Sequence, residues 1–133
     1  MDHMFQGYLF STDKSRLQMD AIDSLMKQTY WATERSLEKS QKAARNSVCY
    51  GIYSPDGKQV GYTRVITDFT TTFYVCDVII DQNHRGHGLG KELLRTVTED
   101  YPGLMGILLT RDAHGLYEKY GFTRDGETFM MKR

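Results

Sequence analysis

The chain has 133 residues, which predicts a single domain over residues 1–133. Its 40% hydrophobic content is that of a globular protein and excludes a disordered or collagen-like chain. Seventeen basic and seventeen acidic residues give zero net charge, so no overall field attracts nucleic acid or an anionic membrane. No segment has the pattern of a signal peptide or a membrane span. The two cysteines, Cys49 and Cys76, lie in apolar stretches, which predicts buried thiols in a cytoplasmic protein.

The first half of the chain predicts a strand, two helices and a hairpin. A short strand covers residues 8–10, and the polar residues 11–13 can cap a helix whose apolar positions recur at helical spacing over residues 17–28. A second helix runs from residue 33 or 34 to about 45, with Leu37 and Ala44 on its inner face. Two strands, residues 48–53 and 59–67, flank the turn Ser54-Pro55-Asp56-Gly57.

The second half alternates strands and helices. A nearly continuous apolar run over residues 73–80 is typical of a central strand covered on both faces. A glycine-rich loop follows, and then come a helix, a strand, a short helix and a last strand, at residues 88–100, 106–110, 113–120 and 128–132. This order indicates an α/β protein with helices on the faces of a mixed sheet.

The glycine-rich loop lies between the central strand and an amphipathic helix, and reads His84-Arg85-Gly86-His87-Gly88-Leu89-Gly90-Lys91. A helix N-terminus exposes unpaired N–H groups, and glycine lets a ligand approach the backbone closely, so phosphate is the expected guest. Arg85, His87 and Lys91 add positive charge. The alternative is a tight strand-to-helix turn that binds nothing.

Two well-known phosphate loops do not fit this segment. A Walker A loop ending at Gly90-Lys91 needs glycine where Arg85 stands and Ser or Thr where Glu92 stands. The dinucleotide fingerprint starting at Gly86 needs a small residue at the position of Lys91.

The pattern that fits is R-x-x-G-x-G from Arg85 to Gly90, which resembles the acetyl-CoA loop of the GCN5-related N-acetyltransferases, the GNAT superfamily. The segment Ala113-His114-Gly115-Leu116-Tyr117-Glu118-Lys119-Tyr120-Gly121-Phe122 is similar to the family's late A-x-x-x-Y-x-x-x-G-F motif. The resemblance implies an α/β (α+β) fold with a mixed, mostly antiparallel sheet flanked by helices on both faces. It also implies direct transfer of the acetyl group of acetyl-CoA to a primary amine.

The resemblance implies roles for particular residues. The backbone of the central strand pairs with the pantetheine arm at Val78, Ile79 and Ile80. The pyrophosphate lies on the amides of Arg85, Gly86, His87, Gly88, Leu89, Gly90 and Lys91. Tyr117 protonates the leaving thiolate, and a backbone N–H of the central strand stabilises the oxyanion. Seven residues before the motif tyrosine, where many members carry asparagine, this chain has Thr110, so that contact is not expected.

Each catalytic assignment has a structural alternative. Tyr117 can be a packed aromatic beside the helix stop Gly121-Phe122. Asp77 interrupts an apolar strand, and it can be the base that deprotonates the amine or a hydrogen-bonding group in a β-bulge. Asp68 is a second candidate for the base. His84 and His87 have no companions at zinc-site spacing and are expected to be surface residues, without a metal.

The acceptor itself cannot be read from the sequence. Tyr30, Trp31 and Arg35, between the first two helices, are candidates to line its pocket, since this region often does so in the family, and simple packing is the alternative. We expect a small-molecule or peptide amine as partner, neither nucleic acid nor membrane, and we leave a homodimer open. The alternatives to N-acetyl transfer are a sensor that binds CoA or acyl-CoA without turnover, and a transferase for another acyl-CoA.

Overall fold

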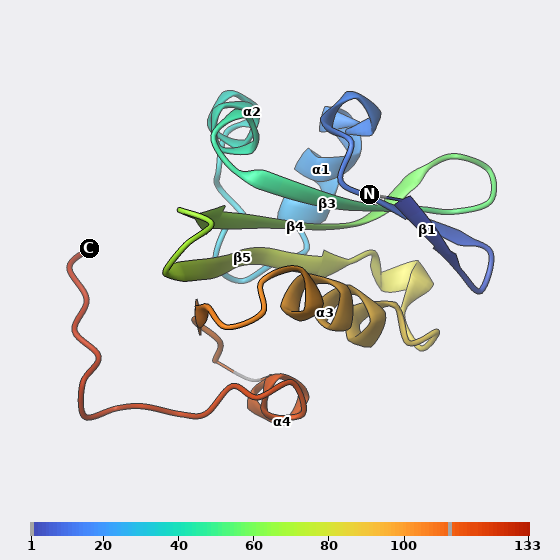
Figure 1. Cartoon of the computed structure of the whole chain (residues 1–133). Coiled ribbons are helices and arrows are strands. Elements are labelled where there is room, and N and C mark those ends of the chain that lie inside the picture. The colour runs from blue at the N-terminus through green and yellow to red at the C-terminus, as the bar shows by residue number, and fades with distance from the viewer. Residues whose placement is uncertain (1, 112) are drawn as a thin grey trace.

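The computed structural model describes residues 2–111 and 113–133 (Figure 1). The strands are β1 (Asp2–Phe5), β2 (Tyr8–Ser11), β3 (Val48–Tyr53), β4 (Gln59–Thr67), β5 (Thr72–Ile80) and β6 (Met105–Leu108). The helices are α1 (Met19–Met26), α2 (Leu37–Arg45), α3 (Leu89–Asp100) and α4 (His114–Glu118), with the 3-10 turns η1 (Lys14–Arg16) and η2 (Gln82–His84).

The strands form one sheet in the order β1-β2-β3-β4-β5-β6. Every neighbouring pair is antiparallel except β5 and β6, which are parallel and joined through α3. Figure 1 shows α1 and α2 on one face of the sheet and α3 on the other, with α4 on the side of α3. The predicted fold class, a mixed and mostly antiparallel sheet with helices on both faces, is confirmed.

Each face of the sheet carries its own hydrophobic core. Val97 and Leu93 of α3 are fully buried against Phe73 and Val75 of β5. On the other face, apolar residues of α1 pack with Ala44 of α2 and with buried residues of β3, β4 and β5: Ile22, Leu25, Met26, Cys49, Tyr62 and Ile79. The central strand β5 is therefore covered on both faces, as predicted.

A β-bulge interrupts β5 in its middle. Tyr62 pairs with Ile79 and Arg64 pairs with Cys76, so Thr63 lies opposite both Asp77 and Val78. Asp77 has a φ of 55°, in the left-handed region, and the Thr63 hydroxyl donates to the Cys76 carbonyl at 2.7 Å. The extra residue turns the Asp77 side chain towards the face that carries α1 and α2.

Both ends of the chain differ from prediction. β1 was not predicted, and it forms a hairpin with β2 through Gln6 and Gly7, both at positive φ. The predicted strand over residues 128–132 is wrong: no strand forms there, and the Asp125 carboxylate instead accepts hydrogen bonds from the Thr128 hydroxyl and amide. Because a strand needs a partner ladder, residues with strand propensity but no neighbouring strand remain irregular.

Three smaller predictions also need correction. Ser36 caps α2 by accepting the Lys39 amide, so the helix begins at residue 37 rather than 33 or 34. Leu37 is 37% exposed and does not face inward, whereas Ala44 is buried as expected. Cys49 is buried but Cys76 is only half-buried, and both are free thiols. No helix in the described part of the chain is long and apolar enough to cross a membrane.

Candidate functional site

The glycine loop leaves the end of β5 and enters α3 in an ordered path. Asp81 caps η2 by accepting the Asn83 amide at 3.1 Å, and the Arg85 guanidinium donates to the Ile80 carbonyl at 3.2 Å. Gly86 and Gly88 have φ values of 88° and 75°, which other residues adopt only with strain. The two glycines thus allow the sharp turn between strand and helix.

The first turn of α3 has no side-chain cap. Ser36 caps α2 through its hydroxyl, but the N-cap of α3 is Gly88, which has no side chain to offer. The amides of residues 85–91 make none of the turn or capping hydrogen bonds that satisfy their neighbours Asn83 and His84. Because a helix N-terminus carries about half a positive charge, these amides form a suitable site for an anion.

Gly90 has no structural reason to be glycine. Its φ is not positive, and it lies in the first turn of a helix, where glycine is less favourable than alanine. A Cβ placed on it would meet only the Ile80 side chain, at 4.0 Å, which is ordinary contact. Protein packing therefore does not exclude a side chain here, whereas a ligand lying on the backbone would.

A groove for an extended ligand begins where β5 and β6 separate. Their pairing covers Thr72 to Val75 of β5 and ends at Val75 with Leu108. The edge of residues 76–80 that faces away from β4 has no strand partner among the described residues. This edge, which includes Val78, Ile79 and Ile80, leads directly to the glycine loop. Apart from the Ile80 carbonyl, which accepts from Arg85, this unpaired edge fits an arm with amide groups that pairs like a strand.

The Asp77 carboxylate is the centre of a buried polar cluster. One oxygen, Oδ2, accepts from Arg35 Nη1 and Arg64 Nε, each at 2.6 Å, and Oδ1 accepts from Trp31 Nε1 at 3.2 Å. The structure thus brings together Trp31, Arg35 and Asp77, which were predicted separately as acceptor and catalytic residues. Arg64 was missed. The available signal was a charged residue in the strand that pairs with β5, opposite Cys76 and so next to Asp77.

These contacts fix the ionisation of the cluster. Burial would raise the pKa of Asp77, but the hydrogen bond from Arg35 and the charge of Arg64 outweigh it and hold the pKa below its usual value of 3.8. A general base works best with a pKa near the working pH. The geometry therefore favours the hydrogen-bonding alternative for Asp77 over proton abstraction.

Tyr30 and Trp31 form an aromatic wall beside this cluster. Each is 45% exposed, and their rings meet edge to face with centroids 5.0 Å apart. The Arg111 guanidinium stacks over the Tyr30 ring at 3.7 Å, and the Arg111 amide donates to the Tyr30 hydroxyl at 3.0 Å. Both rings are therefore partly exposed side chains and not members of the buried core.

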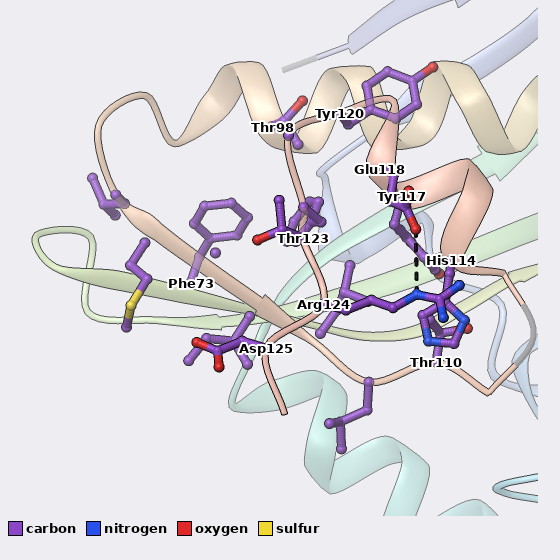
Figure 2. Close-up of a pocket in the computed structure, with 18 of the residues that line it drawn as sticks. Phe73, Thr98, Thr110, His114, Tyr117, Glu118, Tyr120, Thr123, Arg124 and Asp125 are labelled. Carbon is purple, nitrogen blue, oxygen red and sulfur yellow. Dashed lines mark ion pairs between the residues drawn. The ribbon is translucent and has the colours of Figure 1, made fainter. Parts of the chain in front are cut away.

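Tyr117 lies on α4, where it is buried against Phe122 with ring centroids 6.2 Å apart. The Thr110 hydroxyl accepts the amide of Ala113, the N-cap residue of α4, at 3.1 Å. Tyr117 also borders a hollow of about 950 Å³ between β6, α4 and the C-terminal segment. Figure 2 shows Phe73 at one end of it and Thr110 and His114 at the other. None of residues 76–91 lines the hollow, so it is distinct from the glycine loop and the free edge of β5.

The remaining polar candidates have structural roles. Asp68 accepts the amides of Thr70, Thr71 and Thr72, which lowers the pKa of its carboxyl and leaves it a weak base in an exposed turn. His84 bonds the Tyr8 hydroxyl at 3.0 Å, and His87 is exposed. Within residues 2–111 and 113–133, no three His, Cys, Asp or Glu side chains are placed to hold a metal ion.

Comparison with known proteins places the chain in a family. The family model of the acetyltransferase (GNAT) domain matches residues 45–124. A Gibberella zeae protein named "putative acetyltransferase FG08082" is 33% identical over 84% of this chain and 76% of its own length.

Solved structures extend the likeness to the whole fold. The crystal structure of a "putative acetyltransferase belonging to the gnat family" from Xanthomonas campestris pv. campestris has a TM-score of 0.89 and 38% identity, over 98% of this chain and 95% of that one. Glucosamine-6-phosphate N-acetyltransferase from Arabidopsis thaliana shares the fold, with a TM-score of 0.67 and 17% identity over 95% and 97% of the two chains. The protein belongs to the acetyltransferase (GNAT) family.

Proposed function

We propose that the protein is an N-acetyltransferase that uses acetyl-CoA to acetylate a primary amine directly. The observation that carries this proposal is Gly90, an unstrained first-turn helix glycine that protein packing does not require. It lies beside amides that have no capping partner, at the end of a strand edge that is free to pair. Acetyl-CoA, with a pyrophosphate and an amide-bearing arm, fits both features.

The chain's own groups have separate tasks in this proposal. The amides of residues 85–91 bind the pyrophosphate, and the exposed Arg85 and Lys91 side chains neutralise its charge. The free edge of Val78, Ile79 and Ile80 aligns the pantetheine arm beside the bulge. A backbone N–H at the bulge stabilises the oxyanion of the addition step. The acetyl-CoA thioester supplies the activated acetyl group.

Two proton movements complete the reaction. The amine attacks in its unprotonated form, and Tyr117 donates its hydroxyl proton to the departing sulfur. The proton that the attacking nitrogen then loses passes through water to the Tyr117 phenolate and restores the hydroxyl. Asp77, with its lowered pKa, does not take up the amine proton; it positions Arg35, Arg64 and Trp31 on the acceptor side. The rate constant kcat/KM should therefore rise with pH as the acceptor amine loses its proton.

Turnover with a panel of amines tests the proposal. Purified protein is incubated with acetyl-CoA and each amine, and both free thiol and acetylated amine are measured, the latter by mass spectrometry. Acetylated amine formed in proportion to thiol supports the proposal. Tight binding of acetyl-CoA without acetylation of any amine would instead indicate a sensor, and faster transfer from another acyl-CoA would replace the acetyl assignment.

A further inference from the structure

The Asp77 cluster carries more positive than negative charge. Two guanidiniums, those of Arg35 and Arg64, share a single carboxylate oxygen. The other groups that act on Arg64 are the Cys76 thiol and the Tyr62 hydroxyl, and burial raises the pKa of both, so they are neutral at pH 7. The cluster therefore has one positive charge in excess.

The two arginines that carry the excess charge reach the surface in part, whereas the carboxylate between them does not. The Asp77 side chain is 4% exposed, but those of Arg35 and Arg64 are 18% and 15% exposed. Arg35 reaches Asp77 through Nη1, while Arg64 uses Nε for Asp77 and Nη1 for the Ser47 hydroxyl. Each guanidinium has five N–H donors, so both retain donors for a further anionic group.

The cluster also lies next to the proposed reaction centre. Asp77 directly precedes Val78, where the free edge of β5 aligns the pantetheine arm. The exposed rings of Tyr30 and Trp31 border the same cluster, through the bond from Trp31 to Asp77. An acceptor that lies on these rings would place its charged end against the two arginines.

We propose that the acceptor is an amine that also carries an anionic group, a carboxylate or a phosphate, bound by Arg35 and Arg64. This inference rests on the proposed function, because it names the substrate class of the same site. Guanidinium groups recognise both anions through paired N–H donors, so the two anions are separated by experiment. Arg35 and Arg64 are then residues that determine acceptor specificity, and Asp77 holds them in place.

Matched acceptor pairs test the proposal in the wild-type protein. One pair is L-phenylalanine and L-phenylalaninamide, and the other is O-phosphoethanolamine and ethanolamine. We expect kcat/KM to be at least tenfold higher for the anionic member of one pair, which also identifies the anion. The proposal is overturned if, in both pairs, the member without the anionic group is acetylated as fast or faster, or if the cationic amine spermidine is preferred. Either result would leave N-acetyl transfer intact.

Variants separate recognition from a structural role. Arg35→Gln and Arg64→Gln should bring the ratio of kcat/KM for the anionic acceptor to kcat/KM for its uncharged partner close to one. Arg45→Gln, which changes an exposed arginine at the end of α2, should leave this ratio unchanged. If the two arginines only support the fold, both members of a pair lose activity equally and the preference stays. If the glutamine variants do not fold, Arg64→Lys, which keeps the charge, is measured in their place.

A binding measurement distinguishes failure of the anion site from failure of the proposed enzyme activity. Calorimetry of CoA-loaded protein compares N-acetyl-L-phenylalanine with its amide, and N-acetyl-O-phosphoethanolamine with N-acetylethanolamine. Tighter binding of an anionic compound in a protein that acetylates no amine would retain the anion site and remove the enzyme activity. Equal binding within both pairs, including no binding at all, would overturn the anion site.

Discussion

Replacing Gly90 with alanine should stabilise the free protein and weaken its binding of CoA. Alanine is more favourable than glycine inside a helix by about 0.5–1 kcal/mol, and we take the lower value because residue 90 lies in the first turn of α3. The new Cβ meets only Ile80, at 4.0 Å, so no packing cost offsets this gain. For a domain of this size, about 0.5 kcal/mol raises Tm by roughly 1–3 °C.

The same methyl group lies where the proposal places phosphate oxygens against the backbone. We expect the affinity for CoA to fall at least tenfold, about 1.4 kcal/mol. Thermal unfolding without ligand and calorimetric titration with CoA measure the two effects. Gly126→Ala, at an exposed glycine where a Cβ would meet nothing within 4 Å, is the matched control and should leave CoA affinity unchanged. Unchanged CoA affinity in Gly90→Ala would refute the phosphate-loop assignment, and a large loss of stability would show that packing requires this glycine.

Three further variants test the other groups of the site. Tyr117→Phe keeps the packing against Phe122, so it should fold normally and bind acetyl-CoA as tightly as wild type while lowering kcat at least tenfold. Full activity would end the general-acid proposal. Arg85→Ala should reduce the salt dependence of CoA affinity, since one exposed phosphate partner is lost, and equal salt slopes would mean that Arg85 does not face the ligand. Asp77→Asn leaves Arg35 and Arg64 without a counter-charge and should lower the free energy of unfolding by about 2–4 kcal/mol. Breaking a fully buried ion pair costs about 3–5 kcal/mol, and we expect less here because both arginines partly reach solvent. The folded pKa of Asp77 is lowered, so its stabilising effect is complete above about pH 4 and is lost as the pH falls through that pKa. The difference in free energy of unfolding between wild type and Asp77→Asn should therefore shrink only in that acid range.

The sequence was most informative where local patterns and burial agree. Strands β3 and β4 have the predicted bounds because a Pro-Asp-Gly turn separates two apolar runs. The start of α3 was predicted within one residue, since the glycines and the amphipathic repeat both mark it. These features are local, so a single sequence contains them.

Features that depend on distant contacts were missed. β1 exists only because its residues pair with β2, and the expected strand at residues 128–132 is absent because no neighbouring strand pairs with it. The partners of Asp77 come from a loop and from a neighbouring strand, Arg35 and Arg64, and a bulge with positive φ sets the direction of its side chain. Sequence reasoning marked this aspartate as exceptional, but its ion pairs with Arg35 and Arg64 are visible only in the structure.

The crystal structure of the protein with acetyl-CoA tests the central claim most directly. Our account predicts the pyrophosphate within hydrogen-bonding distance of the amides of residues 85–91 and the pantetheine arm along Val78, Ile79 and Ile80. The thioester would then lie near the bulge at Asp77. Acetyl-CoA bound instead in the hollow between β6 and the C-terminal segment, with the glycine loop vacant, would contradict it.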